Sequence, residues 1–322
     1  MTKRALITGA PGQDGRYLAE LLLGRGYQVY GVVGPEPGEY LDWVAERGSF
    51  IEAVEGDLAD QHSLDVLMQR HQPGEVYNFA ALSSVAASWS NPDVYADING
   101  RGVARLIAAI QAHVPHAHLV QASSAEIFGN PSHSPQDETT PIAPTNPYGE
   151  SKAIAHRAIR AARAAGLHAS NAILYNHESP LRPTTFVTAK IADAAARIAR
   201  GLAGELRLGN LDAVRDWGFA GDYVEAMARI ASAQTPDDFV VATGEPHTVR
   251  DFAREAFARV GLDYERYVIE DSALFREADA SALVGDSTKL RTTLGWTPAI
   301  RFEQLVHMMV DAALDRIGAG GS

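Results

Sequence analysis

Three residues with catalytic chemistry occur in two short motifs. Tyr148 and Lys152 lie four residues apart in PYGESK, at the start of a segment predicted to be helical, so their side chains share one helix face. A lysine ammonium beside a phenol favours the phenolate and is expected to lower the pKa of the tyrosine towards the range of a general base. Ser124, in QASSAEIFG, follows a predicted strand at residues 118–122, where its hydroxyl can hydrogen-bond a substrate hydroxyl that loses its proton. A Tyr–Lys pair of this spacing is otherwise a common surface pair, and the serine makes it a catalytic candidate.

A glycine-rich turn near the N-terminus is the second chemical feature. In TGAPGQDG, Gly9, Gly12 and Gly15 lie between a predicted strand at residues 4–8 and a predicted helix at residues 16–23. Glycines permit a tight turn and a close approach of backbone N–H groups to a pyrophosphate, which the helix N-terminus also attracts. A glycine turn without a ligand is the alternative. The strand-turn-helix context favours a dinucleotide site.

Acidic residues follow the second and third predicted strands. Glu36 and Glu39 come after the strand at residues 28–33, and the next basic residue is Arg47. An acidic residue at this position accepts from the ribose hydroxyls of NAD, whereas NADP needs a basic one. Asp57, in EGDLAD, could accept from the adenine amino group, although it could equally cap the next helix. The sequence therefore favours NAD over NADP.

Strands and helices alternate through the first half of the chain, which predicts a doubly wound, Rossmann-type parallel sheet with helices on both faces. We expect this dinucleotide-binding domain to span residues 1–175 and to receive a later segment near residues 209–235. Residues 176–322 would form mainly a smaller mixed α/β region that binds substrate. Further strands are expected at residues 206–208 and 239–242 of this region, and helices at 249–260 and 302–317. Ligands of such sheets lie at the carboxyl ends of the strands.

Composition excludes several classes of protein. The chain has 322 residues, 46% of them hydrophobic and 21% charged, which is typical of a globular protein. It has no cysteine, so disulfides, thiolate zinc sites and cysteine nucleophiles are excluded. The net charge of −12 argues against a nucleic-acid partner. No apolar run approaches the roughly 20 residues of a membrane helix. The N-terminal apolar stretch is too short for a signal peptide, so a cytoplasmic location is expected.

These motifs together resemble those of extended short-chain dehydrogenases/reductases that act on nucleotide-activated sugars. The resemblance narrows to the GDP-mannose 4,6-dehydratase family and covers nearly the whole chain. The segments that carry it are GQDGRYLAELL, ETTPIAPTNPYGESK, NAILYNHESPLRPTTFVTAKI, LGNLDAVRDWGFAGDYVEAM and FREADASALVGDSTKLRTTLGW. NHES and RDWG are much more specific than a glycine-rich turn.

The resemblance implies a reaction and a role for each catalytic residue. Ser124, Tyr148 and Lys152 would carry the hydride chemistry, with Tyr148 taking the O4 proton as C4 transfers its hydride to the cofactor. The new ketone acidifies the C5 proton, which Glu126 would remove and return to the departing C6 hydroxyl. Hydride then returns to C6, giving a 4-keto-6-deoxy sugar without net redox change.

The resemblance also implies binding residues. Those expected at the cofactor, besides the three glycines, Glu36, Asp57 and the Tyr148–Lys152 pair, are Gln13, Asp14, Leu58 and His177. Those expected at the GDP-sugar are Ser84, Asn176, Val187, Lys190, Arg215, Arg276 and Asp279. Arginine suits a diphosphate because its guanidinium binds in a bidentate manner. No metal site is expected, because His177 has no second ligand at i+4 and the reaction requires none.

The chain departs from the family pattern at a few positions. Gly34 and Pro35 replace a basic pair that holds an NADP phosphate and helps build a tetramer, so we expect NAD and a homodimer. Ala125 stands in the loop after Ser124, where the family pattern is S/T-S-E. Asp279 replaces a ribose-binding glutamate and is one methylene shorter. The last two changes leave another nucleotide sugar, such as a GDP-heptose, as an alternative substrate.

Two other functions remain open from the sequence. A 4-keto-6-deoxy-sugar reductase or a nucleotide-sugar C4 epimerase needs Tyr148 and Lys152 but no essential base at C5, and such enzymes also often carry SSAE in this loop. A nucleotide-sensing or scaffold protein without activity would have no need of Ser124, Tyr148 and Lys152. The retained residues therefore favour an enzyme.

Overall fold

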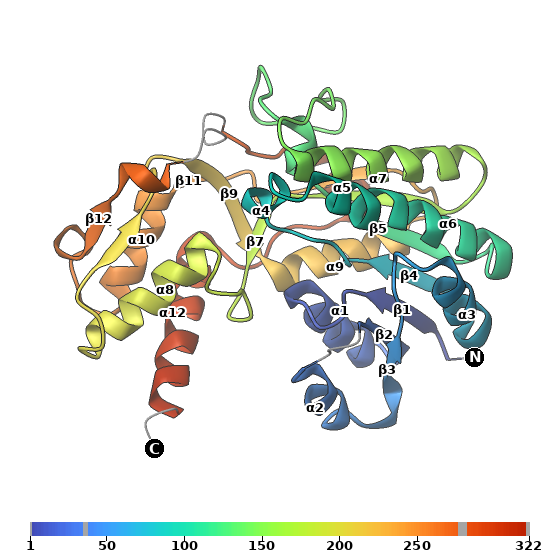
Figure 1. Ribbon diagram of the computed structural model, residues 1–322, viewed down its shortest axis with the longest axis horizontal. Coiled ribbons are helices and arrows are strands. Elements are labelled where there is room, and N and C mark those ends of the chain that lie inside the picture. The colour runs from blue at the N-terminus through green and yellow to red at the C-terminus, as the bar shows by residue number, and fades with distance from the viewer. Residues whose placement is uncertain (1, 35–37, 276–281, 320–322) are drawn as a thin grey trace.

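A seven-stranded, wholly parallel sheet forms the centre of the protein, as predicted (Figure 1). The computed structural model describes residues 2–34, 38–275 and 282–319. The strands of this sheet are β1 (Arg4–Thr8), β2 (Gln28–Val33), β3 (Ile51–Glu55), β4 (Glu75–Asn78), β5 (His118–Ser124), β6 (Ala169–Leu174) and β10 (Asp238–Val241). Their order is β10-β6-β5-β4-β1-β2-β3, so the chain reverses its direction of winding between β1 and β4. The carboxyl ends of these two strands mark the expected ligand site.

Helices cover both faces of the sheet. Their bounds are α1 (Gln13–Gly24), α2 (Tyr40–Ala45), α3 (Gln61–His71), α4 (Val85–Ser88), α5 (Pro92–Tyr95), α6 (Gly102–His113), α7 (Pro147–Ala164), α8 (Val187–Ala199), α9 (Ala220–Ala231), α10 (Val249–Arg259), α11 (Thr288–Leu294) and α12 (Phe302–Ala319). Helices α1 and α9 pack together on one face, where Leu18 and Met227 are buried. Helices α3, α6 and α7 cover the other face, where Leu67 and Ile110 are buried. This is the doubly wound arrangement predicted from the sequence.

A smaller lobe lies beside the sheet and appears on the left of Figure 1. It contains a three-stranded sheet of β11 (Pro246–Thr248), β9 (Val214–Phe219) and β7 (Asn176–Glu178), and a parallel pair of β12 (Val268–Glu270) and β8 (Leu206–Leu208). Apolar side chains of α8, α10 and α12 form its core. Strands β7 and β9 were not predicted, because three to six residues without alternation carry little periodic signal. The division into two domains near residue 175 stays a prediction.

The predicted strand near residue 239 does not belong to the smaller region. Asp238–Val241 is β10, which pairs with β6 at the edge of the main sheet. All four residues are buried, and such a continuously buried segment needs the two covered faces of a parallel sheet. The helical structure between β4 and β5 is irregular, because a π-helical segment at Ala96–Arg101 separates α5 from α6.

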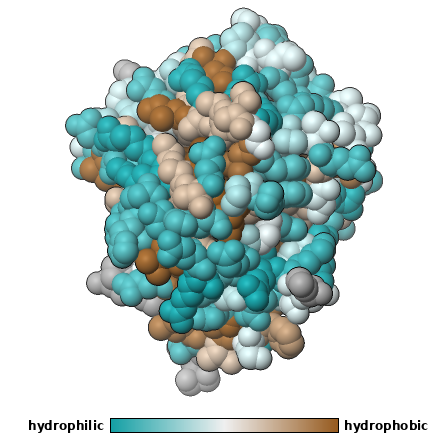
Figure 2. Space-filling model, turned by 90° about the vertical axis from the view of Figure 1, so that its right-hand side faces the viewer, coloured by the Kyte–Doolittle hydropathy of each residue, from teal (hydrophilic) through white to brown (hydrophobic). Residues whose placement is uncertain are grey.

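Figure 2 looks onto the right-hand side of Figure 1 and shows hydrophilic residues over most of that face, with smaller hydrophobic areas among them. This agrees with amphipathic helices whose apolar sides face the sheet. Within the described residues, no helix is long and apolar enough to cross a membrane.

Two stacked histidines at the end of α9 predict a loss of stability in acid. The rings of His118 and His168 stack with centroids 3.7 Å apart, and each ring contacts a carbonyl at or beyond the end of the helix, Ala231 O at 2.7 Å and Ala233 O at 2.9 Å. Burial, followed by the charge of His118, lowers the pKa of His168. Because the folded pKa lies below the unfolded value, protonation favours unfolding, and stability falls as pH drops below about 6.5.

The measurement is urea unfolding at about pH 7.5 and about pH 5.5. We expect the His168→Gln variant to lose less stability between these pH values than the wild type. His116→Gln, which changes an exposed histidine two residues before His118, is the matched control and should keep the wild-type dependence. An unchanged dependence in His168→Gln would contradict the prediction.

Candidate active site

The predicted catalytic side chains meet at the carboxyl end of β5. Ser124 is the last residue of this strand, and its side chain lies near enough to Tyr148, in the first turn of α7, to affect the pKa of that tyrosine. Lys152 follows one turn later, with Nζ 5.8 Å from the centroid of the Tyr148 ring. Its Nζ donates to the carbonyl of Ala122 on β5, at 2.9 Å. The structure thus brings together the three residues that the sequence singled out.

The pKa values of this pair differ from the expected ones. Burial raises the pKa of Tyr148 to about 12, although the hydrogen bond with Ser124 opposes the rise. Burial also lowers the pKa of Lys152 to about 8. The expected lowering of the tyrosine pKa is therefore wrong for this structure. The physical reason is that removal of a phenolate from water outweighs its stabilisation by neighbouring groups.

Glu126 lies beside these residues in a short 3₁₀ segment, Ala125–Phe128. Its backbone N–H donates to Ser124 Oγ at 3.2 Å, and its Oε2 accepts from Asn146 Nδ2 at 2.8 Å. Asn146 also begins α7, because its Oδ1 accepts from the N–H of Gly149 at 2.8 Å. Asn146 therefore links the carboxylate to the helix that carries Tyr148. Sequence reasoning missed Asn146, although an asparagine before proline is a typical helix start.

The glycine-rich turn fits a dinucleotide. A Cβ at Gly9 would lie 2.7 Å from the backbone N of Ala80, and one at Gly15 would lie 2.5 Å from Cα of Ala10, so backbones approach closely at both positions. Gly12 precedes α1, and within the described residues no side chain caps this end of the helix. The first N–H groups of α1 are thus available to an anion at the switch point of the sheet.

Gln13 and Asp14 connect this turn to the smaller lobe. Gln13 Nε2 donates to the carbonyl of His177 at 3.1 Å, and the Ser179 hydroxyl donates to Gln13 Oε1 at 2.7 Å. His177 Nε2 lies 3.0 Å from Asp14 Oδ2. Burial opposes charge on both groups, but each stabilises the other, so the pKa of Asp14 is lowered and the pKa of His177 is raised. This ion pair fixes β7 against the predicted cofactor site.

The other predicted cofactor residues are less informative. Asp57 is exposed and its Oδ1 accepts from the N–H of Ala59 at 2.8 Å, a local turn contact. Leu58 is buried, and its carbonyl accepts from Arg105 at 3.2 Å. Glu36 lies outside the described residues.

The predicted substrate residues surround the same edge of the sheet only in part. Asn176 lies on β7 and pairs with Trp217 of β9. Arg215 lies on the same strand as Trp217, two residues before it. Arg215 Nη1 donates to the carbonyl of Val214 at 2.7 Å. Ser84 caps α4, where its side chain accepts from the N–H of Ala87 at 3.2 Å.

The remaining predicted substrate residues lie on α8 or beyond the described segments. Val187 is the exposed first residue of α8, and Lys190 is exposed one turn later. Lys190 Nζ donates to the carbonyl of Arg207 at 2.7 Å, which directs it towards β8. Arg276 and Asp279 lie outside the described residues.

Arg182 is a second site residue that sequence reasoning missed. Its Nε lies 3.0 Å from Glu178 Oε2, and its guanidinium stacks on the Phe186 ring at 3.6 Å. Its positive charge opposes the rise in the pKa of Tyr148 and helps to lower the pKa of Asp14. From the sequence, the segment ESPLRPTTF is interpreted only as irregular. Arg182 is the one basic residue of this segment, and its charge was the signal that could have identified it as a site residue.

In residues 2–34, 38–275 and 282–319 no cluster of three or more histidine, aspartate or glutamate side chains is arranged to hold a metal ion. Tyr148 and Glu126 are groups that can take protons, Tyr148 from a hydroxyl and Glu126 from a second position.

This chain is similar to known proteins over nearly its whole length. A family model described as GDP-mannose 4,6 dehydratase matches residues 6–309. GDP-mannose 4,6 dehydratase 2 of Arabidopsis thaliana is 45% identical over 326 residues, covering 97% of this chain and 87% of that protein. GDP-mannose 4,6 dehydratase of Homo sapiens is 38% identical over 339 residues, covering 97% and 91%.

Solved structures share the fold. The UDP-glucose 4-epimerase of Thermus thermophilus in complex with NAD superposes with a TM-score of 0.84 at 26% identity, covering 96% of this chain and 98% of that one. The family model and the two sequence relatives indicate the same family, and the fold is consistent with it. The chain belongs to the GDP-mannose 4,6-dehydratase family.

Proposed function

We propose that this protein is a cytoplasmic dehydratase that converts GDP-mannose to GDP-4-keto-6-deoxymannose. The observation that carries the proposal is the grouping of Ser124, Glu126 and Tyr148 at the end of β5, in a chain of the GDP-mannose 4,6-dehydratase family. A reductase or an epimerase needs the tyrosine but no second base beside it. The cofactor is a nicotinamide dinucleotide, for which the glycine turn and the start of α1 form the site.

The mechanism assigns one proton transfer to each base. Tyr148, as the phenolate, takes the O4 proton of the sugar, and Ser124 hydrogen-bonds the same oxygen. A nicotinamide cofactor held at the glycine turn and the start of α1 would supply the reversible hydride chemistry that links C4 and C6. Glu126 takes the C5 proton, which the C4 ketone has made acidic, and delivers it to the C6 hydroxyl so that water leaves. When C6 has been reduced, C5 takes up a proton from solvent and Tyr148 releases the O4 proton. Overall one water is lost, C4 is oxidised and C6 is reduced, without net redox change.

The diphosphate requires cations near the sugar. We propose that Lys190 and Arg215 supply them, since their side chains donate to backbone carbonyls of Arg207 and Val214, which a phosphate oxygen could replace as acceptors. Asn176, Ser84 and Val187 are proposed to contact the sugar nucleotide as well. Arg276 and Asp279 keep their expected roles as a proposal from the resemblance.

The proposed activity is tested by incubating the purified protein with GDP-mannose and NAD and measuring the mass of the nucleotide sugar. Loss of one water is the expected result. Absorbance of reduced cofactor is not a suitable readout, because the hydride returns to the sugar. An unchanged mass would contradict the proposal and direct the search to another sugar nucleotide, such as a GDP-heptose, or to reductase and epimerase activity.

Cofactor choice gives a separate prediction, namely that NAD binds more tightly than NADP. The first described residue after β2 is Gly34, and Arg47 further on is held by Glu20 at 2.6 Å and lies on the Trp43 ring at 4.0 Å. Arg47 is thus engaged elsewhere and not free for a ribose phosphate. We expect the Kd for NAD to be at least about tenfold lower, a difference of about 1.4 kcal/mol. Calorimetric titration of both cofactors measures this, and equal or tighter binding of NADP would contradict it.

We also propose a homodimer, formed through α4, α5 and α7. Trp89 directly follows α4, and Val94 and Ile154 lie on α5 and α7. They are 62%, 47% and 42% exposed and form an apolar group suited to a second copy of the same surface. Ile154→Asp is expected to produce monomers in sedimentation velocity. Val66→Asp is the matched control, because Val66 is also 42% exposed but lies on α3. A wild-type monomer, or a dimer that survives Ile154→Asp, would contradict this interface.

A further inference from the structure

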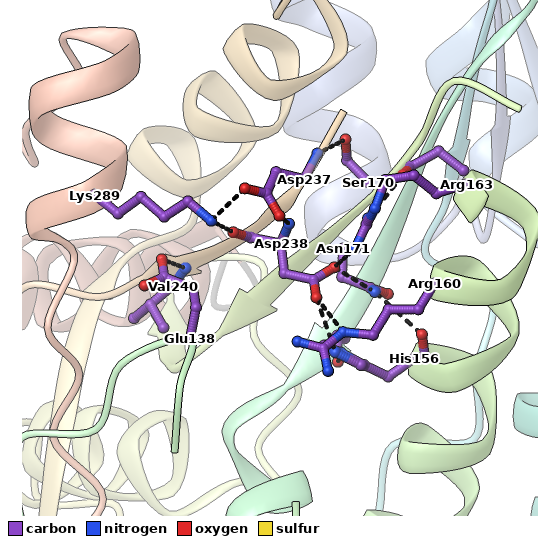
Figure 3. A network of polar contacts seen from close by, with 12 residues as sticks. Glu138, His156, Arg160, Arg163, Ser170, Asn171, Asp237, Asp238, Val240 and Lys289 are labelled. Carbon is purple, nitrogen blue, oxygen red and sulfur yellow. Dashed lines mark hydrogen bonds and ion pairs between the residues drawn. The ribbon is translucent and has the colours of Figure 1, made fainter. Parts of the chain in front are cut away.

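A buried polar network lies directly behind the catalytic serine. Ser123 Oγ is 3.1 Å from His156 Nδ1, and His156 Nε2 is 3.3 Å from Asp238 Oδ2. Figure 3 shows His156 and Asp238 facing each other across the gap between α7 and β10. The three side chains are 3%, 1% and 2% exposed. Serine, histidine and aspartate also occur together in hydrolases, but a serine this deeply buried cannot reach a substrate.

Asp238 is the anchor of the network. Its Oδ1 accepts from Asn171 Nδ2 at 2.8 Å and from Arg163 Nη2 at 2.9 Å, and its Oδ2 accepts from Arg160 Nε at 2.5 Å (Figure 3). Burial works against its charge, but contacts with His156, Asn171 and Arg160 lower its pKa below the usual range. Residues 156, 160 and 163 all belong to α7. A single charged carboxylate thus fastens α7 to the edge of the main sheet at three positions.

Two members of the network, Ser123 and His156, lie next to active-site residues in the chain. Ser123 immediately precedes Ser124 on β5, and His156 follows Lys152 by one turn on the buried side of α7. Lys152 itself donates to the carbonyl of Ala122 at 2.9 Å. Helix α7 and strand β5 are therefore joined by two successive polar contacts, Lys152 to Ala122 and His156 to Ser123. The second contact is also tied to Asp238.

We propose that Ser123, His156 and Asp238 are positioning residues that hold α7 against β5 and so set the placement of Tyr148 and Lys152 relative to Ser124. The inference rests on the proposed function for the roles of these last three residues. Loss of one member leaves its buried polar partners without hydrogen bonds. A shift of α7 would relieve the energetic cost of these unpaired groups. A shift of about 1 Å at reacting groups can lower a rate about 100-fold while binding is retained.

The first test separates kcat from binding. We expect kcat to fall about 10-fold in Ser123→Ala and about 100-fold in His156→Leu, with intermediate values in His156→Gln, which keeps a polar side chain. KM for the sugar nucleotide and Kd for NAD should stay within about twofold of wild type. Asp237→Asn is the matched control: it removes the charge of the neighbouring carboxylate, which is 48% exposed and pairs with Lys289 at 2.6 Å, but its amide oxygen can still accept from the Asp238 N–H. It should retain wild-type kcat. If His156→Leu fails to fold, the kcat values of Ser123→Ala and His156→Gln decide whether the network has a positioning role.

The second test needs no substrate. Trace acetylation followed by mass spectrometry reports the reactivity of the Lys152 amine. Burial lowers the pKa of this amine to about 8, and its contact with Ala122 holds it in that buried place. We expect labelling of Lys152 to rise about fivefold or more in Ser123→Ala and His156→Gln, but not in Asp237→Asn. If wild type fails to dehydrate GDP-mannose but this rise occurs, the proposed function is wrong and the positioning role stands. Unchanged labelling overturns the positioning role, whether kcat or the melting temperature falls or not.

Discussion

Glu126→Gln is expected to abolish loss of water from the sugar nucleotide, with a decrease in kcat of about 1,000-fold or more. The amide is nearly isosteric with the carboxylate and can keep a contact with Asn146, which lies 2.8 Å from Glu126 Oε2. It cannot accept the C5 proton. Binding of NAD should be unchanged, because the cofactor site lies at the glycine turn.

Two measurements test this prediction. The mass of the product reports dehydration, and solvent deuterium at C5 reports proton removal; both should be lost in the variant. Glu150→Gln is the matched control, since Glu150 is an exposed glutamate in the same first turn of α7 as Tyr148. Near-normal turnover of Glu126→Gln would refute the assignment of this base and favour a reductase or an epimerase.

Tyr148→Phe is expected to lower kcat about 1,000-fold or more, because it removes the group that takes the O4 proton. The wild-type rate should rise with pH from about 6 to about 8, since burial keeps the pKa of Tyr148 high and the reactive phenolate fraction grows with pH. Above the Lys152 pKa of about 8 the lysine loses its charge, and the rise should flatten. The residual rate of the variant should not show this dependence.

A second tyrosine–lysine contact provides the control for Tyr148→Phe. Lys3 Nζ lies 3.2 Å from the Tyr27 hydroxyl at the N-terminal end of the main sheet, away from the carboxyl ends of its strands. Tyr27→Phe should therefore keep wild-type kcat and its pH dependence. Substantial activity in Tyr148→Phe, or the same loss in Tyr27→Phe, would show that Tyr148 is not the base.

Local patterns in the sequence were sufficient for the first half of the fold. The turn from Gly9 to Gly15, the alternation of strands and helices and the Tyr148–Lys152 spacing are all set by residues near one another in the chain. Such features depend on backbone geometry and periodicity, which a single sequence carries. The same reasoning was weaker after residue 175, where short strands such as β7 and β9 owe their pairing to distant partners.

Sequence alone thus determined the Rossmann-type sheet, the dinucleotide turn, and the identity of Ser124, Glu126, Tyr148 and Lys152 as candidates. Tertiary structure decided that Asn146 hydrogen-bonds Glu126 and that the charge of Arg182 opposes the rise in the pKa of Tyr148. It also decided that β10 joins the main sheet, which brings Asp238 to the network next to Ser124. It also reversed the expected direction of the Tyr148 pKa shift. Burial and contacts between residues far apart in the chain govern these features, and neither is encoded in the spacing of a local motif.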